Sequence, residues 1–198
     1  TVNSIVIRFD DKIIVGGKFT TYDNNTQKYL AILNSDGRIG KNFTVGNGLN
    51  DDVNSVVLQE DGKIILGGKF TNFNGISKNR IVRLNSDGSL DESFSVGLGF
   101  DNIVHSIAMQ SDKKIIVAGR FTSFNQIPQK SIVRLNPDGS LDESFSVGIK
   151  FDRVESVLLQ ADGKIVVSGF LTNINEYTER VVFRLNSNGS LDDSFSFA

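Results

Sequence analysis

The sequence contains no cysteine and no tryptophan, and only one histidine and two prolines stand among its 198 residues. The lack of cysteine excludes a disulfide, a zinc–thiolate site and a thiol nucleophile, and it removes any evidence about redox compartment. No apolar run approaches the roughly 18 residues that a membrane-spanning helix requires, so we expect no direct insertion into a membrane. Acidic and basic residues nearly balance, with a net charge of −2 and no basic tract, so we expect no nucleic-acid partner.

The residues that are present describe a soluble globular chain, with 39% hydrophobic and 22% charged residues. A chain of this length accommodates one domain with a sizeable core or an array of small units. The sequence starts at Thr1 without a signal peptide, which indicates a processed product or a piece of a longer protein.

Four near-copies of one ten-residue segment dominate the sequence. They read DDKIIVGGKF, DGKIILGGKF, DKKIIVAGRF and DGKIVVSGFL, and they begin at Asp10, Asp61, Asp112 and Asp162. Segments similar to VNSV precede them with offsets of 51, 51 and 50 residues, starting at Val2, Val53, Val104 and Val154. A period of this size predicts a solenoid, a propeller or an array. We therefore treat residues 1–198 as a single repeat domain with repeats 2–52, 53–103, 104–153 and 154–198.

Each repeat carries the signals of short antiparallel strands. In the second repeat, VNSVVLQ and KIILGGKF are rich in Val and Ile and enclose the turn EDG, which predicts a β-hairpin. Apolar residues fall on both faces of these strands, so we expect both faces to be covered. After a polar stretch, RIVRLNSDGSLDESFSVG predicts a third strand, an Asp-Gly turn and a short fourth strand.

Four antiparallel strands in a repeat of about 50 residues are typical of a β-propeller blade. One such sheet is marginally stable alone, because its apolar faces need neighbouring blades to cover them. We therefore predict an all-β fold, a β-propeller built of four repeats. The repetition of the sequence follows from this fold, since each blade presents the same two faces to its neighbours.

Several single positions recur in the repeats. A small residue in mid-strand indicates a bulge or the close approach of another backbone, and glycine takes this position at Gly17, Gly68, Gly119 and Gly169. We interpret a recurrent aromatic residue as a core anchor between blades, at Phe43, Phe94, Phe145 and Phe195. We also expect ion pairs from blade to blade between Arg83, Arg134 or Arg184 and Asp91, Asp142 or Asp192. The first repeat lacks both partners, because Ile32 and Gly40 take their positions.

The pattern VNSVVLQEDGKIILGGKFTNFNG, followed by RIVRLNSDGSLDESF, resembles the delta-60 repeat, a β-propeller repeat family of bacterial proteins. The likeness covers all four repeats, although the first has RIGKNF in place of SLDESF and the last has SGFL in place of GGKF. The resemblance implies a propeller in a secreted or cell-surface protein, often of gliding or Bacteroidetes-type bacteria, or in a phage-associated protein. It implies no enzymatic activity and no ligand residues.

Propellers close with about four to eight blades, so four repeats leave three arrangements open. The chain closes on itself, belongs to a larger propeller, or completes one ring by association with a second copy. In a self-closed ring, the hairpin of residues 1–20 would complete a sheet with the strands of residues 180–198.

One segment has the spacing of a metal loop. Asn85, Asp87, Ser89 and Asp91 place oxygens at alternate positions, as in a calcium loop. The glycine, however, comes at the fourth position, and Val96 stands where a bidentate Glu belongs. We therefore interpret the segment as a structural turn and expect no metal. The single His105 has no repeated partner, and we interpret it as an incidental strand residue.

The sequence lacks catalytic motifs, including a Gly-x-Ser-x-Gly elbow and a phosphate loop. We expect no cofactor and no enzymatic activity. An alternative stays open: a glycan-binding or glycan-hydrolysing propeller in which carboxylates from several blades converge on a central channel. Against it, Asp61 and Asp91 lie in repeated turns that need them structurally.

The polar stretches between the second and third strands differ in every repeat, and loops on a rigid scaffold are where binding usually resides. They contain the candidate binding residues Tyr22, Tyr29, Phe73, Phe124 and Tyr177. The plain alternative is that these stretches are solvated connectors. We predict a non-catalytic scaffold that mediates protein binding or structural assembly in a secreted, cell-surface or phage or secretion-machinery complex. Self-association is expected if four repeats do not close a ring.

Overall fold

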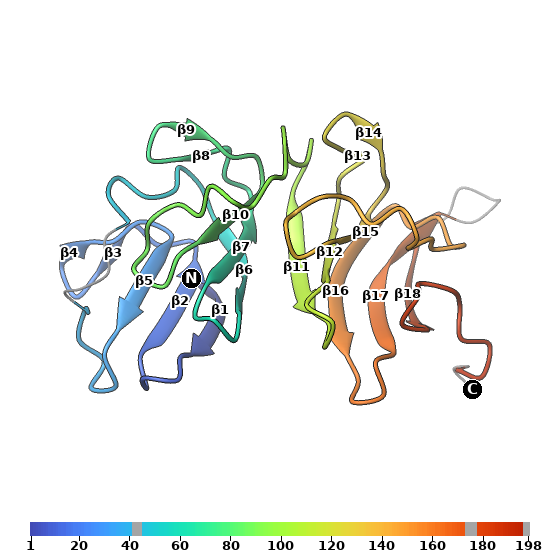
Figure 1. Ribbon diagram of the computed structural model, residues 1–198, viewed down its shortest axis with the longest axis horizontal. Coiled ribbons are helices and arrows are strands. Elements are labelled where there is room, and N and C mark those ends of the chain that lie inside the picture. Colours follow the sequence, from blue (N-terminus) through green and yellow to red (C-terminus); the bar gives the residue numbers. More distant parts are fainter. Residues whose placement is uncertain (41–44, 173–177, 196–198) are drawn as a thin grey trace. The chain divides into compact units, whose positions relative to one another are not determined.

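The computed structural model describes residues 1–40, 45–172 and 178–195, which contain strands and turns and no helix. The all-β prediction is therefore confirmed for the described part of the chain. The chain divides into two compact units, Thr1–Phe100 and Asp101–Ala198, and each holds two sequence repeats (Figure 1). That all four repeats form one domain stays a prediction. The described ranges include no helix that is long and apolar enough to cross a membrane.

The first unit contains ten strands. Repeat 1 has β1 (Val2–Ile7), β2 (Ile13–Gly17), β3 (Thr21–Tyr22), β4 (Asn25–Thr26) and β5 (Leu30–Leu33). Repeat 2 has β6 (Val53–Leu58), β7 (Ile64–Gly68), β8 (Asn72–Phe73), β9 (Ile76–Ser77) and β10 (Ile81–Leu84).

The second unit repeats this order and then departs from it. Repeat 3 has β11 (Val104–Met109), β12 (Ile115–Gly119), β13 (Ser123–Phe124), β14 (Ile127–Pro128) and β15 (Ile132–Leu135). Repeat 4 has β16 (Arg153–Leu159), β17 (Ile165–Thr172) and β18 (Thr178–Leu185).

Each repeat builds one antiparallel three-stranded sheet in which the second strand is central. The sheet orders are β1-β2-β5, β6-β7-β10, β11-β12-β15 and β16-β17-β18 (Figure 1). All residues of the central strands β7 and β12 are buried, as their Ile- and Val-rich sequences predict for strands covered on both faces. A two-stranded hairpin, here called an arm, follows the central strand in three repeats as β3–β4, β8–β9 and β13–β14.

The fourth strand of each repeat is reduced to a single bridge, which differs from the four-stranded blade that the sequence predicts. In repeat 2 this bridge joins Leu84 to Leu90, and equivalent bridges occur in the other three repeats. The chain then turns, because the Asp91 carboxylate accepts hydrogen bonds from the Ser93 amide at 3.0 Å and from its hydroxyl at 2.6 Å. Side-chain bonds of this kind compete with a strand ladder and end it.

The recurrent mid-strand glycine lies at a bulge, as predicted. The pairing of β6 with β7 shifts register between Val53 and Ser55, and the same shift occurs between the first two strands of every repeat. A Cβ atom on Gly68 would overlap the backbone oxygen of Asp52. Only glycine fits this close approach of two backbones.

Neighbouring repeats within a unit pack sheet face against sheet face. In the first unit, Ile14 and Leu30 of repeat 1 share a buried cluster with Val53 and Val56 of repeat 2. Gly16 makes room for this contact, because a Cβ there would lie 2.6 Å from Val53 Cγ1. In the second unit, Ile116, Ala118 and Ile132 of repeat 3 form the corresponding cluster with Phe151, Val154 and Val157.

The serine at the bulge of the first repeat in each unit adds a polar link to the second repeat. The Ser4 hydroxyl accepts a hydrogen bond from the Val56 amide at 3.0 Å, and the Ser106 hydroxyl accepts one from the Val157 amide at 3.2 Å. Because β6 and β16 are edge strands of their sheets, some of their backbone amides face away from the ladder, and the serine of the preceding repeat satisfies one of them.

Repeat 4 replaces the arm by a longer hairpin, in which β17 and β18 pair from Ile165–Leu185 out to Thr172–Thr178. In the other repeats the third strand begins after a residue with positive φ, namely Tyr29, Arg80 or Ser131. Val181 takes that position in repeat 4 and pairs with Gly169. A β-branched residue strongly disfavours positive φ, so the ladder continues where the other repeats break it.

Candidate functional site

A buried carboxylate follows the turn after the third strand in repeats 2, 3 and 4; this turn is Asp-Gly in repeats 2 and 3 and Asn188-Gly189 in repeat 4. In repeat 2, Asp91 Oδ2 lies 2.6 Å from Arg83 Nε and 2.9 Å from Lys63 Nζ. The equivalent residues make the same contacts at 2.7 and 2.8 Å in repeat 3, and at 2.6 and 2.9 Å in repeat 4. These groups are Lys114, Arg134 and Asp142 in repeat 3, and Lys164, Arg184 and Asp192 in repeat 4.

These contacts fix the protonation state of the three aspartates. Burial by itself would raise the pKa of Asp91, but hydrogen bonds from Ser93, Lys63 and Arg83 outweigh it and hold the pKa far below 3.8. Burial is likewise outweighed at Asp142, where Lys114, Ser144 and Arg134 lower the pKa. At Asp192 the hydrogen bond from Ser194 is the largest cause, followed by that from Lys164. Such carboxylates carry no proton at neutral pH and therefore cannot act as general acids.

The ion pairs join residues of one repeat, so the prediction of pairs from blade to blade is wrong. The two partners are only eight residues apart in the sequence, and the turn between Leu84 and Leu90 brings Asp91 back to its own sheet, where its amide donates to the Arg83 oxygen at 3.0 Å. The recurrent phenylalanine covers the pair, with the Arg83 guanidinium 4.5 Å from the centre of the Phe94 ring. Phe145 and Phe195 cover Arg134 and Arg184 at 4.8 Å. Phe43 lies outside the described residues.

One of these rings is also an anchor between blades, as predicted. A Cβ on Gly189 of repeat 4 would lie 2.9 Å from the Phe145 ring of repeat 3, and Phe145 packs against the core that repeats 3 and 4 share.

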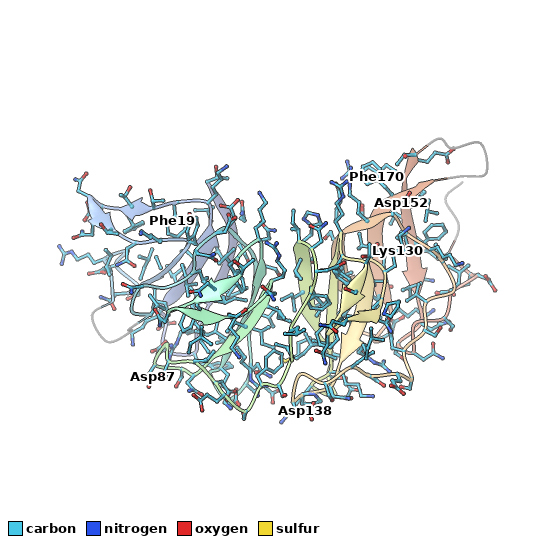
Figure 2. The ribbon with its side chains drawn as sticks, turned by 90° about the horizontal axis from the view of Figure 1, so that it is seen from above. Phe19, Asp87, Lys130, Asp138, Asp152 and Phe170 are labelled. Atoms are coloured by element: carbon cyan, nitrogen blue, oxygen red, sulfur yellow. The ribbon has the colours of Figure 1, made fainter. Side chains whose placement is uncertain are left out.

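The segment with calcium-like spacing uses its oxygens within the turn. Asp87 Oδ1 accepts hydrogen bonds from the Ser89 amide at 2.9 Å and from its hydroxyl at 2.7 Å, and Asn85 Nδ2 donates to Ser89 Oγ. Asp87 and its equivalent Asp138 are labelled in Figure 2. Within the described ranges, the side chains of His, Cys, Asp and Glu form no cluster that would hold a metal ion. These contacts account for the recurring residues by turn chemistry.

His105 lies in β11, between the two residues where the register of the β11–β12 pair shifts. Its neighbours Val104 and Ser106 pair with Gly119 and Ala118.

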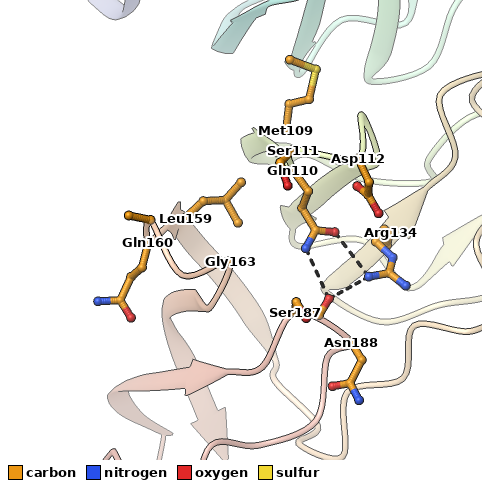
Figure 3. Close-up of a pocket in the computed structure, with 11 residues that line it drawn as sticks. Met109, Gln110, Ser111, Asp112, Arg134, Leu159, Gln160, Gly163, Ser187 and Asn188 are labelled. Atoms are coloured by element: carbon orange, nitrogen blue, oxygen red, sulfur yellow. Dashed lines mark hydrogen bonds between the residues drawn. The ribbon is translucent and has the colours of Figure 1, made fainter.

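A pocket of about 570 Å³ lies where repeats 3 and 4 meet, at the ends of their first hairpins (Figure 3). Its wall includes Met109, Leu159 and Arg134. Arg134 Nη1 donates to the backbone oxygen of Ser187 at 2.7 Å, and Gln110 Nε2 donates to the same oxygen at 3.3 Å. Gln110 Oε1 accepts from Arg134 at 3.3 Å. The strongest polar groups of this pocket therefore hold the two repeats together.

The equivalent point between repeats 1 and 2 uses other residues. Arg8 Nη1 donates to the backbone oxygen of Ser86 at 2.8 Å, and Arg8 Nε lies 3.2 Å from Asp10 Oδ1. Sequence reasoning missed this role of Arg8. The available signal was the exchange of residue types, since Arg8 and Ile32 in repeat 1 correspond to Gln110 and Arg134 in repeat 3.

The five candidate aromatic residues of the polar stretches differ in how far they are buried. Phe73 and Phe124 are buried, so the expectation that they offer a binding surface does not hold for them. Phe73 packs in the core cluster that repeats 1 and 2 share, whereas its pairing partner Ile76 lies at the arm tip and is exposed. Tyr22 is half-buried and donates to the Gly37 oxygen at 2.7 Å. Tyr177 lies outside the described residues.

The arm tips and one neighbouring cleft are the exposed features that sequence reasoning did not single out. Ile76 and Ile127 occupy equivalent tip positions and are exposed large apolar side chains. The half-buried Tyr29 lies with Lys28, Asn47 and Asn72 around a cleft of about 500 Å³ beside the arms of repeats 1 and 2. An adjoining hollow of about 310 Å³ shares Lys28 and Asn47 with it.

Surface charges of the second unit gather near the start of repeat 4. Lys130 Nζ lies 3.2 Å from Asp152 Oδ1, and the Asp152 amide donates to the Phe170 oxygen at 2.8 Å (Figure 2). The Arg153 guanidinium lies 3.9 Å from the centre of the Phe170 ring. These contacts are partly exposed and contribute little to stability.

The architecture of three-stranded repeats packed face to face is that of β-propeller blades, and comparison with known proteins agrees. A family model described as "Domain of unknown function (DUF5122) beta-propeller" matches residues 10–39, 59–94, 110–145 and 160–195. The chain belongs to this β-propeller family. Among curated proteins, no sequence matches the chain.

Solved propeller structures are similar to the chain. The WD40 β-propeller domain of Doa1 has a TM-score of 0.58 at 15% identity, over 92% of this chain and 50% of that one. XC5397 from Xanthomonas campestris, described as a gluconolactonase, has a TM-score of 0.58 at 16% identity, over 96% and 60%. PorZ from Porphyromonas gingivalis, described as a surface component of the type-IX secretion system, has a TM-score of 0.56 at 9% identity, over 95% and 26%. At these identities the likeness shows the fold, and this chain spans less than two thirds of each structure.

Proposed function

We propose that the chain is a non-catalytic binding module, in which blades of the delta-60 type hold the arms against a protein partner. One observation carries this proposal: the arms β3–β4, β8–β9 and β13–β14 share one pairing geometry, and each exposes the residue at the same tip position. These residues are Asn25, Ile76 and Ile127, so two of the three arms present an exposed isoleucine. Exposed side chains at equivalent loop positions of a scaffold are suited to recognition of a partner.

The charged groups support a role without catalysis. Three buried aspartates are each neutralised by an arginine and a lysine of their own repeat. The proposed setting is a secreted, cell-surface or phage or secretion-machinery complex. It follows from the resemblance to delta-60 repeats, and the fold shared with PorZ is consistent with it.

The test compares the wild type with the double variant Ile76→Ser, Ile127→Ser, using affinity enrichment followed by binding to the purified partner. The control variant is Phe9→Ser, which removes an even more exposed apolar side chain from a hairpin turn. We expect the arm variant to weaken binding roughly tenfold or more, because exposed apolar anchors dominate interface energies. Equal binding by all three proteins would reject the arms as the contact surface.

A second candidate function, glycan binding, is favoured by the cleft around Lys28 and Tyr29. An aromatic ring beside a lysine and several amide side chains offers stacking and hydrogen bonds to a sugar. Titration with a panel of oligosaccharides, followed by amide chemical shifts, would test it. Shifts at Lys28 and Asn47 that Tyr29→Ala abolishes would support glycan binding, and the absence of shifts at these residues would reject it.

A further inference from the structure

The first sheet of repeat 1 exposes residues whose equivalents are buried. Val53 and Val56 of repeat 2 pack against repeat 1 and are 0% and 4% exposed. Their equivalents Val2 and Ile5 are 52% and 59% exposed, and Ile7 of the same strand is exposed as well. We call Val2, Ile5 and Ile7 the leading face of repeat 1. This face has the composition of an interface between repeats.

Repeat 4 exposes the face that, in the preceding repeat, covers the next repeat. In repeat 3, the side that covers the next repeat contains Ala108, Ile116, Ala118 and Ile132. The equivalent residues of repeat 4 are Leu158, Val166, Ser168 and Val182, which we call the trailing face. Leu158 is 66% exposed and the other three are half-buried.

The polar groups that join repeats are also present on these two faces. Arg134 and Gln110 of repeat 3 donate to the backbone oxygen of Ser187 in repeat 4. Repeat 4 has Arg184 and Gln160 at the donor positions, and repeat 1 has Ser35 at the acceptor position. Ser156 likewise matches Ser106, whose hydroxyl binds the Val157 amide of the next repeat. The trailing face therefore carries the donors and the apolar groups that a leading face requires.

We propose that the partner of the leading face is a second copy of this chain, which docks its own trailing face there. Val2 and Ile5 of one copy pack on Ser168 of the other, as Val53 and Val56 pack on Gly16 within the first unit. Arg184 donates to the Ser35 oxygen across the interface. The assignment rests on continuity with the two interfaces between repeats, whose residues the two faces reproduce, and the chain spans only 50% of the Doa1 propeller.

The chain has no cysteine, so a disulfide between introduced cysteines tests this contact without competing native thiols. A Cβ on Gly16 would lie 2.7 Å from Val56 Cγ2, so the equivalent positions Ser168 and Ile5 are close enough for a disulfide across the proposed interface. The single variants Ile5→Cys and Ser168→Cys are mixed and oxidised. We expect a mixed disulfide at twice the 21.7 kDa chain mass, with the two expected peptides linked.

Two controls accompany this experiment. The double variant Ala118→Cys, Val157→Cys places the same pair between repeats 3 and 4 and reports whether the geometry permits a disulfide within the fold. Ile127→Cys replaces Ile5→Cys as the negative control, because Ile127 is comparably exposed but lies on an arm. We expect a linked monomer from the first control and no mixed disulfide from the second.

Light scattering of the chain without cysteines completes the test. We expect a dimer whose dissociation constant rises roughly tenfold or more with Ile5→Lys and is unchanged with Ile127→Lys, because only the former buries a charge at the contact. A monomer at all concentrations would overturn the proposal. An intrachain disulfide in the double variant Ile5→Cys, Ser168→Cys would overturn it too, because repeats 1 and 4 of the same chain would then meet. A dimer that Ile5→Lys leaves intact would place the contact elsewhere and reject the proposal.

Discussion

Two interfaces, between repeats 1 and 2 and between repeats 3 and 4, each contain a hydrogen bond from an arginine to a backbone oxygen of the following repeat. The arginine occupies a different sequence position in the two interfaces. Between repeats 1 and 2, Arg8 follows β1 and reaches the Ser86 oxygen at 2.8 Å. Between repeats 3 and 4, Arg134 lies in β15 and reaches the Ser187 oxygen at 2.7 Å. Gln110 takes the position of Arg8 in repeat 3, and Ile32 takes the position of Arg134 in repeat 1.

The difference shows that the location of the arginine follows the location of a carboxylate. Repeat 3 offers Asp142 beneath the sheet, 2.7 Å from Arg134. Repeat 1 has Gly40 at the equivalent position, so an arginine at Ile32 would be buried without a counterion, which costs several kcal/mol. Asp10 balances Arg8 instead, near the protein surface. Both interfaces thus contain a hydrogen bond from an arginine to a backbone oxygen, but the arginine and its carboxylate partner occupy different positions in the repeat.

The largest effect is expected from removing the buried counterion. Asp142→Asn leaves Arg134 and Lys114 without their carboxylate, and we expect a loss of about 3 kcal/mol in the free energy of unfolding. Asp10→Asn removes the exposed counterion of repeat 1 and should cost less than about 1 kcal/mol. Urea unfolding measures both, with hydrogen exchange to assign the loss to the second unit. Equal losses would contradict the distinction between buried and exposed pairs.

Transplanting the residues of repeat 1 into repeat 3 sharpens the comparison. Arg134→Ile alone leaves the Asp142 carboxylate without its arginine, and we expect a cost of about 3 kcal/mol. The combination Gln110→Arg, Arg134→Ile, Asp142→Gly restores a peripheral arginine and removes the carboxylate that has lost its arginine. Its free energy of unfolding should be higher than that of the single variant, as measured by the same urea titration. A triple variant less stable than Arg134→Ile would show that the two arrangements are not interchangeable.

Acid should weaken repeats 2 to 4 through their aspartates. The pKa of Asp142 is lower in the folded state than the ordinary value of 3.8, so its stabilising effect is complete above that value. The effect is lost progressively as the pH falls below about 4 towards the folded-state pKa. Thermal unfolding between pH 6 and pH 2 should show this loss, with a smaller slope in Asp142→Asn. An unchanged slope would mean that other groups cause the acid sensitivity.

The smallest effect is expected at the links between repeats. Ser4→Ala removes the acceptor of the Val56 amide, and one hydrogen bond to a partly buried group contributes about 1 kcal/mol. Ser106→Ala tests the matching link to Val157 in the second unit. Hydrogen exchange of the Val56 and Val157 amides should accelerate only in the variant that lost the corresponding serine.

Local features were predictable because they depend on neighbours in the sequence. The Val- and Ile-rich segments formed the expected hairpins, the recurrent Gly68 lies at a bulge, and the Asp-Gly turns use their own side chains. Features that depend on orientation were not predictable. Phe73 stands among polar residues in the sequence, and only the packing of repeats 1 and 2 shows that its ring lies in the core.

The all-β repeat architecture could be predicted from the amino-acid sequence, because strand propensity, turn chemistry and a period near 50 residues are local properties of the chain. Which charged groups meet depends on the folded arrangement. Arg83 and Asp91 are eight residues apart, and the turn between Leu84 and Leu90 brings them to 2.6 Å within one repeat. The folded arrangement also decided which faces are covered, since Val53 and Val2 are the same residue at equivalent positions, and only Val53 is covered by a neighbouring sheet. Contacts between distant segments depend on packing, so a local sequence pattern does not predict them.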